Sequence, residues 1–380
     1  MGDSVTIFSL IAALLSFVLV AGGIPLAIKL SVRAGFVDAP GGRKVHDHAV
    51  PPIGGLVVFP VFVLIFVFSG FAGGTHWPLI EALALLMAVG AADDYKPIQP
   101  WIKFGAQIVA ACVVVIPGGA QIGTLGDLFG FGGIWLDIFS IPFSIVAMVL
   151  FINGMNLIDG VDGLAGGIGL LAFLWFIAAC VARENIVLLP GLMIVAGGMA
   201  GFLLHNMRTP LRKRASLFLG DAGSLCLGLL MGWYAIKIAE FPGPTMLPIS
   251  VAWIIGLPVF DECAQFYRRV REGKHPFTAD RGHLHHHFLD AGFTPGQTTA
   301  AMLGIVAFMG GFGYLGIVLG IPQFVLAYIW IALLFSHMAL SYRPGRYVRL
   351  VKRMRGKDGT EEGSLAPSNT TPSEKSSGRS

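Results

Sequence analysis

Charged residues are scarce in this sequence. Only 13% of its 380 residues are Asp, Glu, Lys or Arg, whereas 55% are hydrophobic, and the mean hydropathy is +0.74. Soluble globular domains carry about 25% charged residues. The composition therefore argues against an ordinary soluble enzyme and predicts an integral membrane protein.

Paired cysteines are absent as well. The four cysteines, Cys112, Cys180, Cys226 and Cys263, stand singly in apolar segments and form no Cys-x-x-Cys motif. This pattern argues against a disulfide framework and against a cysteine-based zinc site. No basic residue precedes the first apolar run, and no small-residue cleavage site follows it. We therefore expect a retained first helix rather than a cleaved signal peptide.

Long apolar runs, in contrast, are abundant. A membrane-spanning helix needs about 20 mostly apolar residues. On this criterion the sequence predicts an all-α integral membrane protein with about eleven transmembrane helices and one polytopic domain over residues 1–341. Residues 342–380 are expected to form a basic juxtamembrane segment and a disordered tail. The predicted spans lie near residues 5–30, 53–70, 78–92, 103–118, 138–153, 163–182, 186–206, 222–238, 245–262, 297–319 and 321–341.

The basic residues predict how the chain is oriented in the membrane. They gather in alternate connections, including residues 212–214, 268–281 and the chain from Arg343 onward. By the positive-inside rule, these connections are cytoplasmic, the N-terminus is outside and the C-terminus is in the cytoplasm. Five aspartates then fall on the cytoplasmic side: Asp93, Asp94, Asp159, Asp162 and Asp221.

Placing a carboxylate at the edge of the hydrocarbon core of a membrane costs free energy, so these aspartates are candidates for a functional site. Asp93 and Asp94 are adjacent, and their charges repel unless a cation neutralises them. Mg²⁺ prefers carboxylate oxygens and completes its shell with waters and substrate phosphates. A solvated acidic pair at a helix end is the plainer alternative. Asp221 precedes another apolar run, where it completes a metal site or simply caps a helix.

The most specific motif has polar residues at every third position. Asn153, Asn156, Asp159 and Asp162 follow this spacing, which places neighbouring members on one face of a helix or tight turn. Amides can bind a polar ring, and carboxylates can bind a cation or hydroxyl groups. Gly160 leaves room for close approach of the backbone. A capping role explains one such residue but not four in register.

Two polar loops supply basic side chains. Arg43 and Lys44 lie among glycines and can receive a phosphate or simply anchor the membrane face. Arg281 precedes the His-rich residues 283–287, whose spacing does not match a zinc site. Imidazoles beside a diphosphate can instead bind its oxygens and stabilise charge during transfer. A structural loop facing lipid headgroups is the alternative.

Taken in order, these motifs resemble the polyprenyl-phosphate N-acetylhexosamine-1-phosphate transferase family. The resemblance spans residues 30–295 and includes the Asp-Asp pair with Lys103, the Asn-x-x-Asn-x-x-Asp-Gly-x-Asp-Gly run, Gly-Asp-x-Gly-Ser and the His-rich loop. It implies transfer of a sugar 1-phosphate from a UDP-N-acetylhexosamine to undecaprenyl phosphate, with release of UMP. The implied cofactor is Mg²⁺, with Mn²⁺ as a substitute. The implied location is the cytoplasmic leaflet of the bacterial inner membrane.

The resemblance also implies roles for individual residues. Asp93 would handle the lipid phosphate, with Asp94 nearby, and Asp221 would bind the metal. The implied catalytic residues are Asp93, Asp94, Asp159, Asp162, His285 and His286, and the implied metal ligands are Asp221 and Asp94. The implied substrate-binding residues are Arg43, Lys44, Lys103, Asn153, Asn156, Arg281 and His283.

Several alternatives stay open from sequence. N-acetylglucosamine is the preferred sugar, with N-acetylfucosamine as a variant; the product would start a cell-surface polysaccharide. A lipid I-forming transferase is disfavoured because Phe288 and Leu289 follow the histidines where that enzyme usually has Glu. A secondary transporter usually has repeated halves and midplane acids, and neither is visible here. Membrane lipids are expected partners, nucleic acid is not, and a homodimer is one open oligomeric state.

Overall fold

The computed structural model describes residues 2–38, 49–71, 73, 76–210, 212–240, 243–274 and 281–354. In this part of the chain the regular secondary structure is helical, apart from two isolated β-bridges, which confirms the predicted all-α class. The helices are α1 (Gly2–Arg33), α2 (Gly54–Phe68), α3 (Trp77–Tyr95), α4 (Pro100–Val115), α5 (Ser140–Ile158), α6 (Leu164–Ala182), α7 (Leu189–Asn206), α8 (Asp221–Ile238), α9 (Pro248–Ile254), α10 (Gly256–Arg271), α11 (Leu284–Asp290), α12 (Pro295–Val318), α13 (Gln323–Ser341) and α14 (Pro344–Met354).

Each predicted span overlaps one of these helices, the range 245–262 falling on the α9–α10 pair. Among the described residues, 6 helices are long and apolar enough to cross a membrane, or up to 7 if α9 and α10, bent by 73°, form one span. Helices α2 and α4 are apolar but shorter, and α3 and α8 carry charged residues near their ends. The protein is thus a multi-pass membrane protein, and the count of eleven spans stays a prediction.

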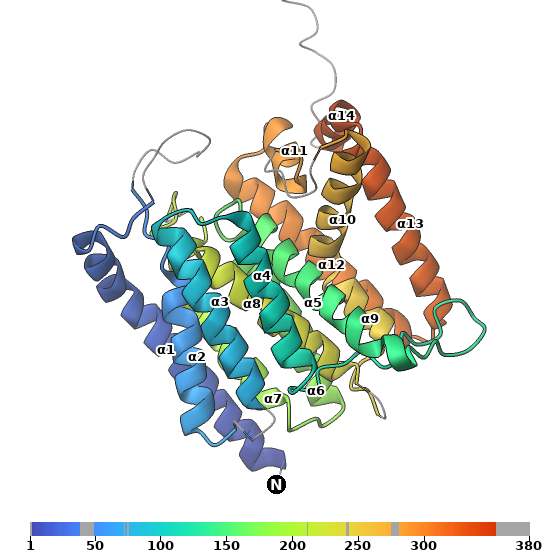
Figure 1. Cartoon of the computed structure of the whole chain (residues 1–380), viewed down its shortest axis with the longest axis horizontal. Helices are drawn as coiled ribbons and strands as arrows, with labels where there is room; N and C mark the ends of the chain where they lie inside the picture. The colour runs from blue at the N-terminus through green and yellow to red at the C-terminus, as the bar shows by residue number, and fades with distance from the viewer. Residues whose placement is uncertain are drawn as a thin grey trace, which may run out of the picture.

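Helix α8 forms the centre of the bundle and packs against α2, α3, α5 and α6 (Figure 1). Small residues allow this packing, because a Cβ atom on Gly55 would lie 2.2 Å from the Cα of Gly223. A Cβ on Gly90 would lie 2.4 Å from the Cα of Ala222. Close backbone contact of this kind is typical of membrane helices. It holds the beginning of α8, and therefore Asp221, directly against α2 and α3.

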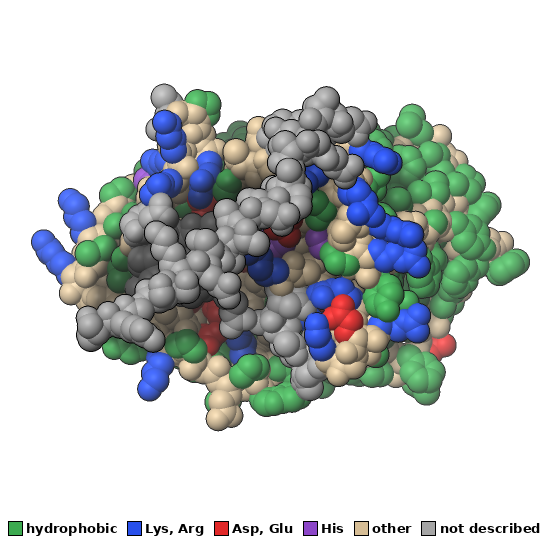
Figure 2. All heavy atoms as spheres, turned by 90° about the horizontal axis from the view of Figure 1, so that it is seen from above, with side chains coloured by type: hydrophobic (Ala, Val, Ile, Leu, Met, Phe, Trp, Pro, Cys, Tyr) green, Lys and Arg blue, Asp and Glu red, His purple; other side chains and the backbone are tan. Residues whose placement is uncertain are grey.

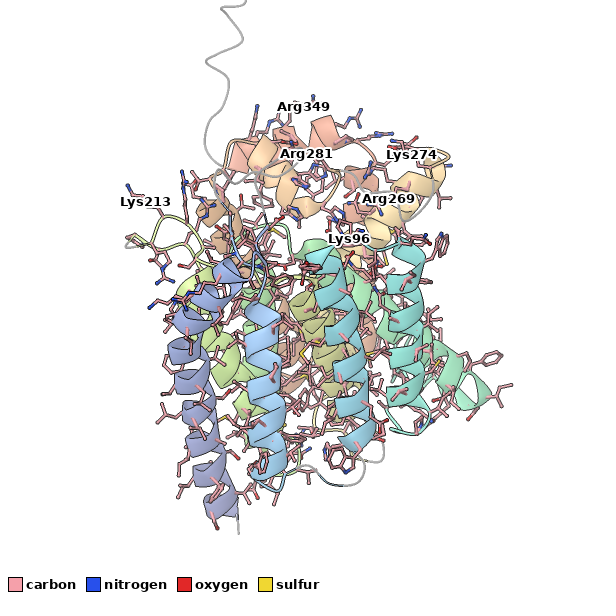
Figure 3. All side chains as sticks on the ribbon, turned by 60° about the vertical axis from the view of Figure 1, so that its left-hand side comes forward. Lys96, Lys213, Arg269, Lys274, Arg281 and Arg349 are labelled. Carbon is pink, nitrogen blue, oxygen red and sulfur yellow. The ribbon has the colours of Figure 1, made fainter. Side chains whose placement is uncertain are left out.

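Basic side chains gather at one end of the bundle (Figure 3), and the N-terminus lies at the other end (Figure 1). Lys96, Lys213, Arg269, Arg281 and Arg349 all lie there. Seen from that end, acidic and histidine side chains show between the Lys and Arg side chains (Figure 2). The predicted clustering of basic connections at one face is therefore present in the fold.

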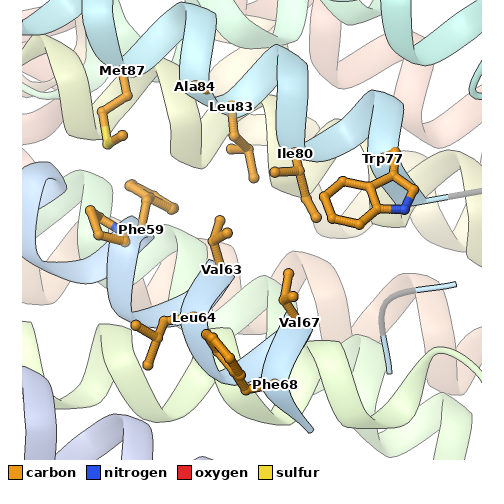
Figure 4. Close-up of a pocket in the computed structure, with 11 residues that line it drawn as sticks. Phe59, Val63, Leu64, Val67, Phe68, Trp77, Ile80, Leu83, Ala84 and Met87 are labelled. Atoms are coloured by element: carbon orange, nitrogen blue, oxygen red, sulfur yellow. The ribbon is translucent and has the colours of Figure 1, made fainter. Parts of the chain in front are cut away.

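The apolar flank of the bundle has a different character. Helices α2 and α3 face each other across a groove of about 420 Å³ whose lining is entirely apolar, with Phe59 and Met87 towards one end and Phe68 and Trp77 towards the other (Figure 4). Such a surface offers no partner for a polar substrate. Charged and polar side chains gather instead at the basic end (Figure 2).

The C-terminal juxtamembrane segment forms helix α14, which sequence reasoning did not predict as a helix. Tyr347 and Val351 are buried on one side of it, whereas Arg346 and Arg349 are exposed. The helix therefore docks on the protein through its apolar side. Residues 355–380, with the predicted disordered tail, lie outside the described residues.

Candidate active site

A polar cavity of about 630 Å³ opens at the basic end of the bundle. It is formed where α3 and α5 end and α8 begins, so residues far apart in sequence meet there. All five predicted aspartates line it, as do Asn156, Arg208 and His286. The cavity thus confirms that these acids converge: Asp93, Asp94, Asp159, Asp162 and Asp221.

The carboxylate of Asp94 caps helix α8. Its Oδ1 accepts the N–H of Asp221 at 2.8 Å, and its Oδ2 accepts the N–H of Ala222 at 3.1 Å. These N–H groups have no partner within their own helix. Gly220 adopts a φ of 78°, and a Cβ there would lie 2.7 Å from Asp94 Oδ2, so glycine is required at this turn. The idea that Asp221 caps its own helix is therefore wrong, and its carboxylate is free to serve the cavity.

Lys103 bridges two of the acids. Its ammonium donates to Asp93 Oδ2 at 3.0 Å and to Asp221 Oδ2 at 2.7 Å. The other oxygen of Asp221 accepts from Asn156 Nδ2 at 2.5 Å, and the same amide donates to Ser224 Oγ at 2.8 Å. One continuous polar chain therefore joins α3, α4, α8 and α5. The positive charge of Lys103 offsets the repulsion between the Asp93 and Asp221 carboxylates.

The donor set suits a magnesium ion only in part. Carboxylate and amide oxygens are the ligands Mg²⁺ prefers, and one or two carboxylates suffice when substrate phosphates supply the rest. The residues that the structure describes contain no ready group of three or more metal-ligating side chains. The ammonium of Lys103 instead sits between Asp93 and Asp221. The site therefore fits a metal that arrives with a phosphate-bearing ligand better than a permanently bound one.

Asp159 and Asp162 follow α5 and differ in their surroundings. Burial, together with the negative charges of Asp221, Asp94 and Asp162, raises the pKa of Asp159 to about 8. At neutral pH this carboxyl can therefore hold a proton and donate a hydrogen bond. Asp162 accepts from Arg208 Nε at 2.6 Å and from the N–H of Ala215 at 3.3 Å. It lines the cavity while fixing the loop that follows α7.

Two of the predicted histidines reach the cavity wall. His286 lines the cavity, and His285 lies against Gly160, where an added Cβ would come 2.4 Å from its Nε2 atom. Burial lowers the pKa of His285 to about 3. Burial, and then the charge of Arg281, lowers the pKa of His286 to about 4. Both rings are therefore neutral at physiological pH and would bind a phosphate by donating N–H groups rather than by charge.

Replacing Gly160 by Ala tests this contact. The added methyl group must displace the buried His285 ring, and a displacement of about 1 Å at a reacting centre can cost up to about 100-fold in rate. We expect kcat to fall about tenfold with little change in Tm. Gly105→Ala is the matched control, because a Cβ there meets no atom within 4 Å. Wild-type kcat in Gly160→Ala would show that the position of His285 does not matter.

The other predicted site residues lie elsewhere. Arg43 and Lys44 lie outside the described residues. Asn153 donates to Glu262 at 2.8 Å, and His283 donates from Nδ1 to Asp261 at 2.9 Å; neither lines the cavity. Arg281 is exposed and pairs with Asp290 at 3.4 Å.

Sequence reasoning missed the acidic pair Asp261 and Glu262. Both are buried, although they are adjacent carboxylates in an otherwise apolar predicted span. That is the same signal which drew attention to Asp93 and Asp94. Applied to the range 245–262, it would have found them.

The bundle contains helices long enough to cross a membrane. At one end it carries clustered carboxylates, a bridging lysine and histidines. These features define a membrane enzyme with a polar site at its surface. The profile of glycosyl transferase family 4 matches residues 76–239, which include α3 to α8. The chain belongs to glycosyl transferase family 4.

Three curated relatives show how far the likeness extends. The undecaprenyl-phosphate alpha-N-acetylglucosaminyl 1-phosphate transferase of Yersinia pestis is 30% identical over 334 residues, covering 87% of this chain and 90% of the relative. The Salmonella typhi protein of the same name is 29% identical over 337 residues, with the same coverage. The decaprenyl-phosphate N-acetylglucosaminephosphotransferase of Mycolicibacterium smegmatis is 32% identical over 317 residues, covering 73% and 75%.

Proposed function

We propose that this enzyme transfers N-acetylglucosamine 1-phosphate from UDP-N-acetylglucosamine to undecaprenyl phosphate. The three relatives are named as undecaprenyl-phosphate or decaprenyl-phosphate transferases of N-acetylglucosamine phosphate, and the similarity covers most of their length. Both facts support this choice of acceptor and sugar. The observation that carries the proposal is the acidic cavity bridged by Lys103 at one end of an apolar bundle. There a polyprenyl tail can stay in lipid while its phosphate meets a water-soluble donor.

We assign the basic end of the bundle to the cytoplasmic side of a bacterial inner membrane. The positive-inside rule supports this assignment, because Lys and Arg gather at that end (Figure 2, Figure 3). The N-terminus lies at the other end and would be outside. The donor then enters from the cytoplasm, where nucleotide sugars are made.

In the proposed reaction, an oxygen of the lipid phosphate attacks the sugar-bearing phosphorus of the donor. The bond from that phosphorus to the bridging oxygen breaks, UMP leaves, and a lipid diphosphosugar remains. Catalysis of such a transfer depends mostly on positioning and on charge stabilisation. Asp93 takes the proton of a singly protonated acceptor phosphate. Lys103 and the N–H groups of His285 and His286 face the phosphate oxygens.

Asp221 and Asp94 are the ligands that we assign to Mg²⁺, with Mn²⁺ as a substitute. The Asp221 side chain does not cap helix α8, and the Asp94 carboxylate retains lone pairs beyond its two hydrogen bonds to backbone N–H groups. When bound, the ion would neutralise charge on the donor diphosphate. Asn156 donates to the Asp221 carboxylate, and in the proposed arrangement it would lie on the nucleotide side of the cavity.

The purified protein in detergent with undecaprenyl phosphate and a panel of UDP-sugars tests the proposal. We expect UMP release with UDP-N-acetylglucosamine and Mg²⁺, and none when EDTA removes the metal. UDP-N-acetylfucosamine and UDP-N-acetylmuramoyl-pentapeptide serve as the competing donors. Metal-independent release, or no release with any UDP-amino-sugar, would reject the proposal.

A further inference from the structure

Asp261 on helix α10 lies at the centre of a buried polar network outside the acidic cavity. The residue is only 2% exposed. Its Oδ2 accepts from His283 Nδ1 at 2.9 Å, and its Oδ1 accepts the N–H of Leu284 at 2.8 Å. Burying a charge is costly unless it is paired and hydrogen-bonded. Both oxygens of this carboxylate are used, and both contacts go to the segment that carries the cavity histidines.

These two contacts fix the beginning of α11. This helix has 7 residues, Leu284–Asp290, and the side chain of its N-terminal flanking residue makes no capping bond. So short a helix is not stable by itself. Asp261 accepts the first of its unpaired N–H groups. Asp261 therefore ties the beginning of α11 to α10, while α12 and α14 pack against the same short helix.

The same carboxylate fixes the tautomer of His283. Because Nδ1 of that ring donates to Asp261, Nε2 is left as an acceptor, and it faces the Arg269 guanidinium at 3.5 Å. His283 lies ring over ring with His285, with centroids 5.8 Å apart and planes within 6° of each other. The His285 and His286 centroids are 4.3 Å apart. The orientation of the His283 ring therefore constrains the His285 ring beside it and, through that ring, His286, which lines the cavity.

The network also reaches the C-terminal helices. His337 Nε2 on α13 lies 4.0 Å from Asp261 Oδ1, and His337 Nδ1 is 2.9 Å from the hydroxyl of Tyr347 on α14. The Tyr347 ring packs on His287, with centroids 4.9 Å apart. Helices α11 and α13 therefore approach the buried Asp261 carboxylate, and α14 joins the network through His337 and His287, which leaves α11 little freedom to shift.

We propose that Asp261 is a positioning residue for the transfer reaction, holding α11 so that His285 and His286 meet the substrate phosphates. This inference deepens the proposed function and rests on it for its kinetic test. Asp261 does not line the cavity, so its effect on the reaction would be indirect. It acts through the two contacts it makes with His283 and Leu284.

The variant Asp261→Asn keeps the shape of the side chain but can accept at only one of the two positions. We expect the protein to fold and kcat to fall about 30-fold, in the range that misplacement of catalytic groups produces. Ser250→Ala is the matched control, because it removes a buried 2.8 Å hydrogen bond between α9 and α12. We expect the control to keep its activity within about twofold, because substitutions at distant sites without shared partners act independently of each other. Wild-type kcat in Asp261→Asn would overturn the proposal.

A double-mutant cycle separates positioning from general destabilisation. In a His285→Gln/His286→Gln background the rings to be positioned are gone. Asp261→Asn should then cost less than about threefold, because residues that act through one another are not additive. A full 30-fold loss in that background would show that Asp261 acts by another route, and would overturn the proposal.

Hydrogen exchange tests the same contact without any substrate. Peptides covering Leu284–Asp290 should exchange faster in Asp261→Asn than in the wild type, whereas peptides from α12 should not change. Unchanged exchange in α11 would contradict the proposal. If the wild-type protein transferred no sugar phosphate, the proposed function would fail, but this measurement would still decide whether Asp261 holds α11.

Discussion

Replacing Asp221 by Asn should lower kcat about 10³-fold, equivalent to about 4 kcal/mol of transition-state stabilisation, while the bundle stays folded. Asp221 accepts from Lys103 at 2.7 Å and from Asn156 at 2.5 Å, one donor on each oxygen. An amide has only one accepting oxygen, so one donor would face an NH₂ group. The variant also loses the charge that we assign to metal binding. Both effects act at the centre of the cavity.

The measurement is kcat from UMP release at saturating substrates, with folding checked by size exclusion and Tm. Asp127→Asn is the control, because Asp127 lies in the loop between α4 and α5, at the far end of the bundle (Figure 1). Within the described part of the chain, its carboxylate accepts the N–H groups of Gly130 and Gly132, both in the same loop. We expect that variant to be as active as the wild type. Wild-type kcat in Asp221→Asn would remove Asp221 from the catalytic set.

Replacing Lys103 by Gln should lower kcat about 10²-fold, as loss of a single preorganised charge stabiliser does. The ammonium lies within 3.0 Å of both Asp93 and Asp221, so its removal leaves two carboxylates without their cation. Their repulsion then favours any other cation. We therefore expect the variant to need less Mg²⁺ for half-maximal activity although its turnover is slower.

Both parameters come from one titration of UMP release against Mg²⁺. Lys237→Gln is the matched control, because Lys237 lies at the other end of α8, paired with Glu240 and the carbonyl of Gly119. It should match the wild type in both parameters. A Lys103→Gln enzyme with unchanged kcat, or one that needs more Mg²⁺, would contradict the role given to this lysine.

The convergence of the aspartates could be predicted because it depends on topology alone. Basic residues mark alternate connections as cytoplasmic, and every acid of the set lies beside such a connection. The partners of each acid depended on tertiary packing. No local pattern shows that Asp94 caps a helix 127 residues away, or that Lys103 bridges Asp93 to Asp221. The periodic run 153–162 predicted one shared face, yet Asn153 contacts Glu262 whereas Asn156 reaches the cavity.

The apolar runs located the helices well but not their breaks. The range 245–262 contains Gly256 and Pro258, and the helix bends by 73° where α9 meets α10. Pro disrupts a helix interior, so this break was foreseeable. Helix α14 was harder to predict, because its stretch is strongly basic and buries only a narrow apolar stripe around Tyr347 and Val351.

The destination of the sugar-bearing phosphate tests the central claim most directly. UDP-N-acetylglucosamine can be prepared with radioactive phosphorus only at the phosphate attached to the sugar, and incubated with the enzyme, undecaprenyl phosphate and Mg²⁺. Transfer of a sugar 1-phosphate in the acidic cavity predicts that the label moves into the lipid fraction while unlabelled UMP is released. Label that stays in water-soluble UDP, with only the sugar in the lipid, would contradict this account.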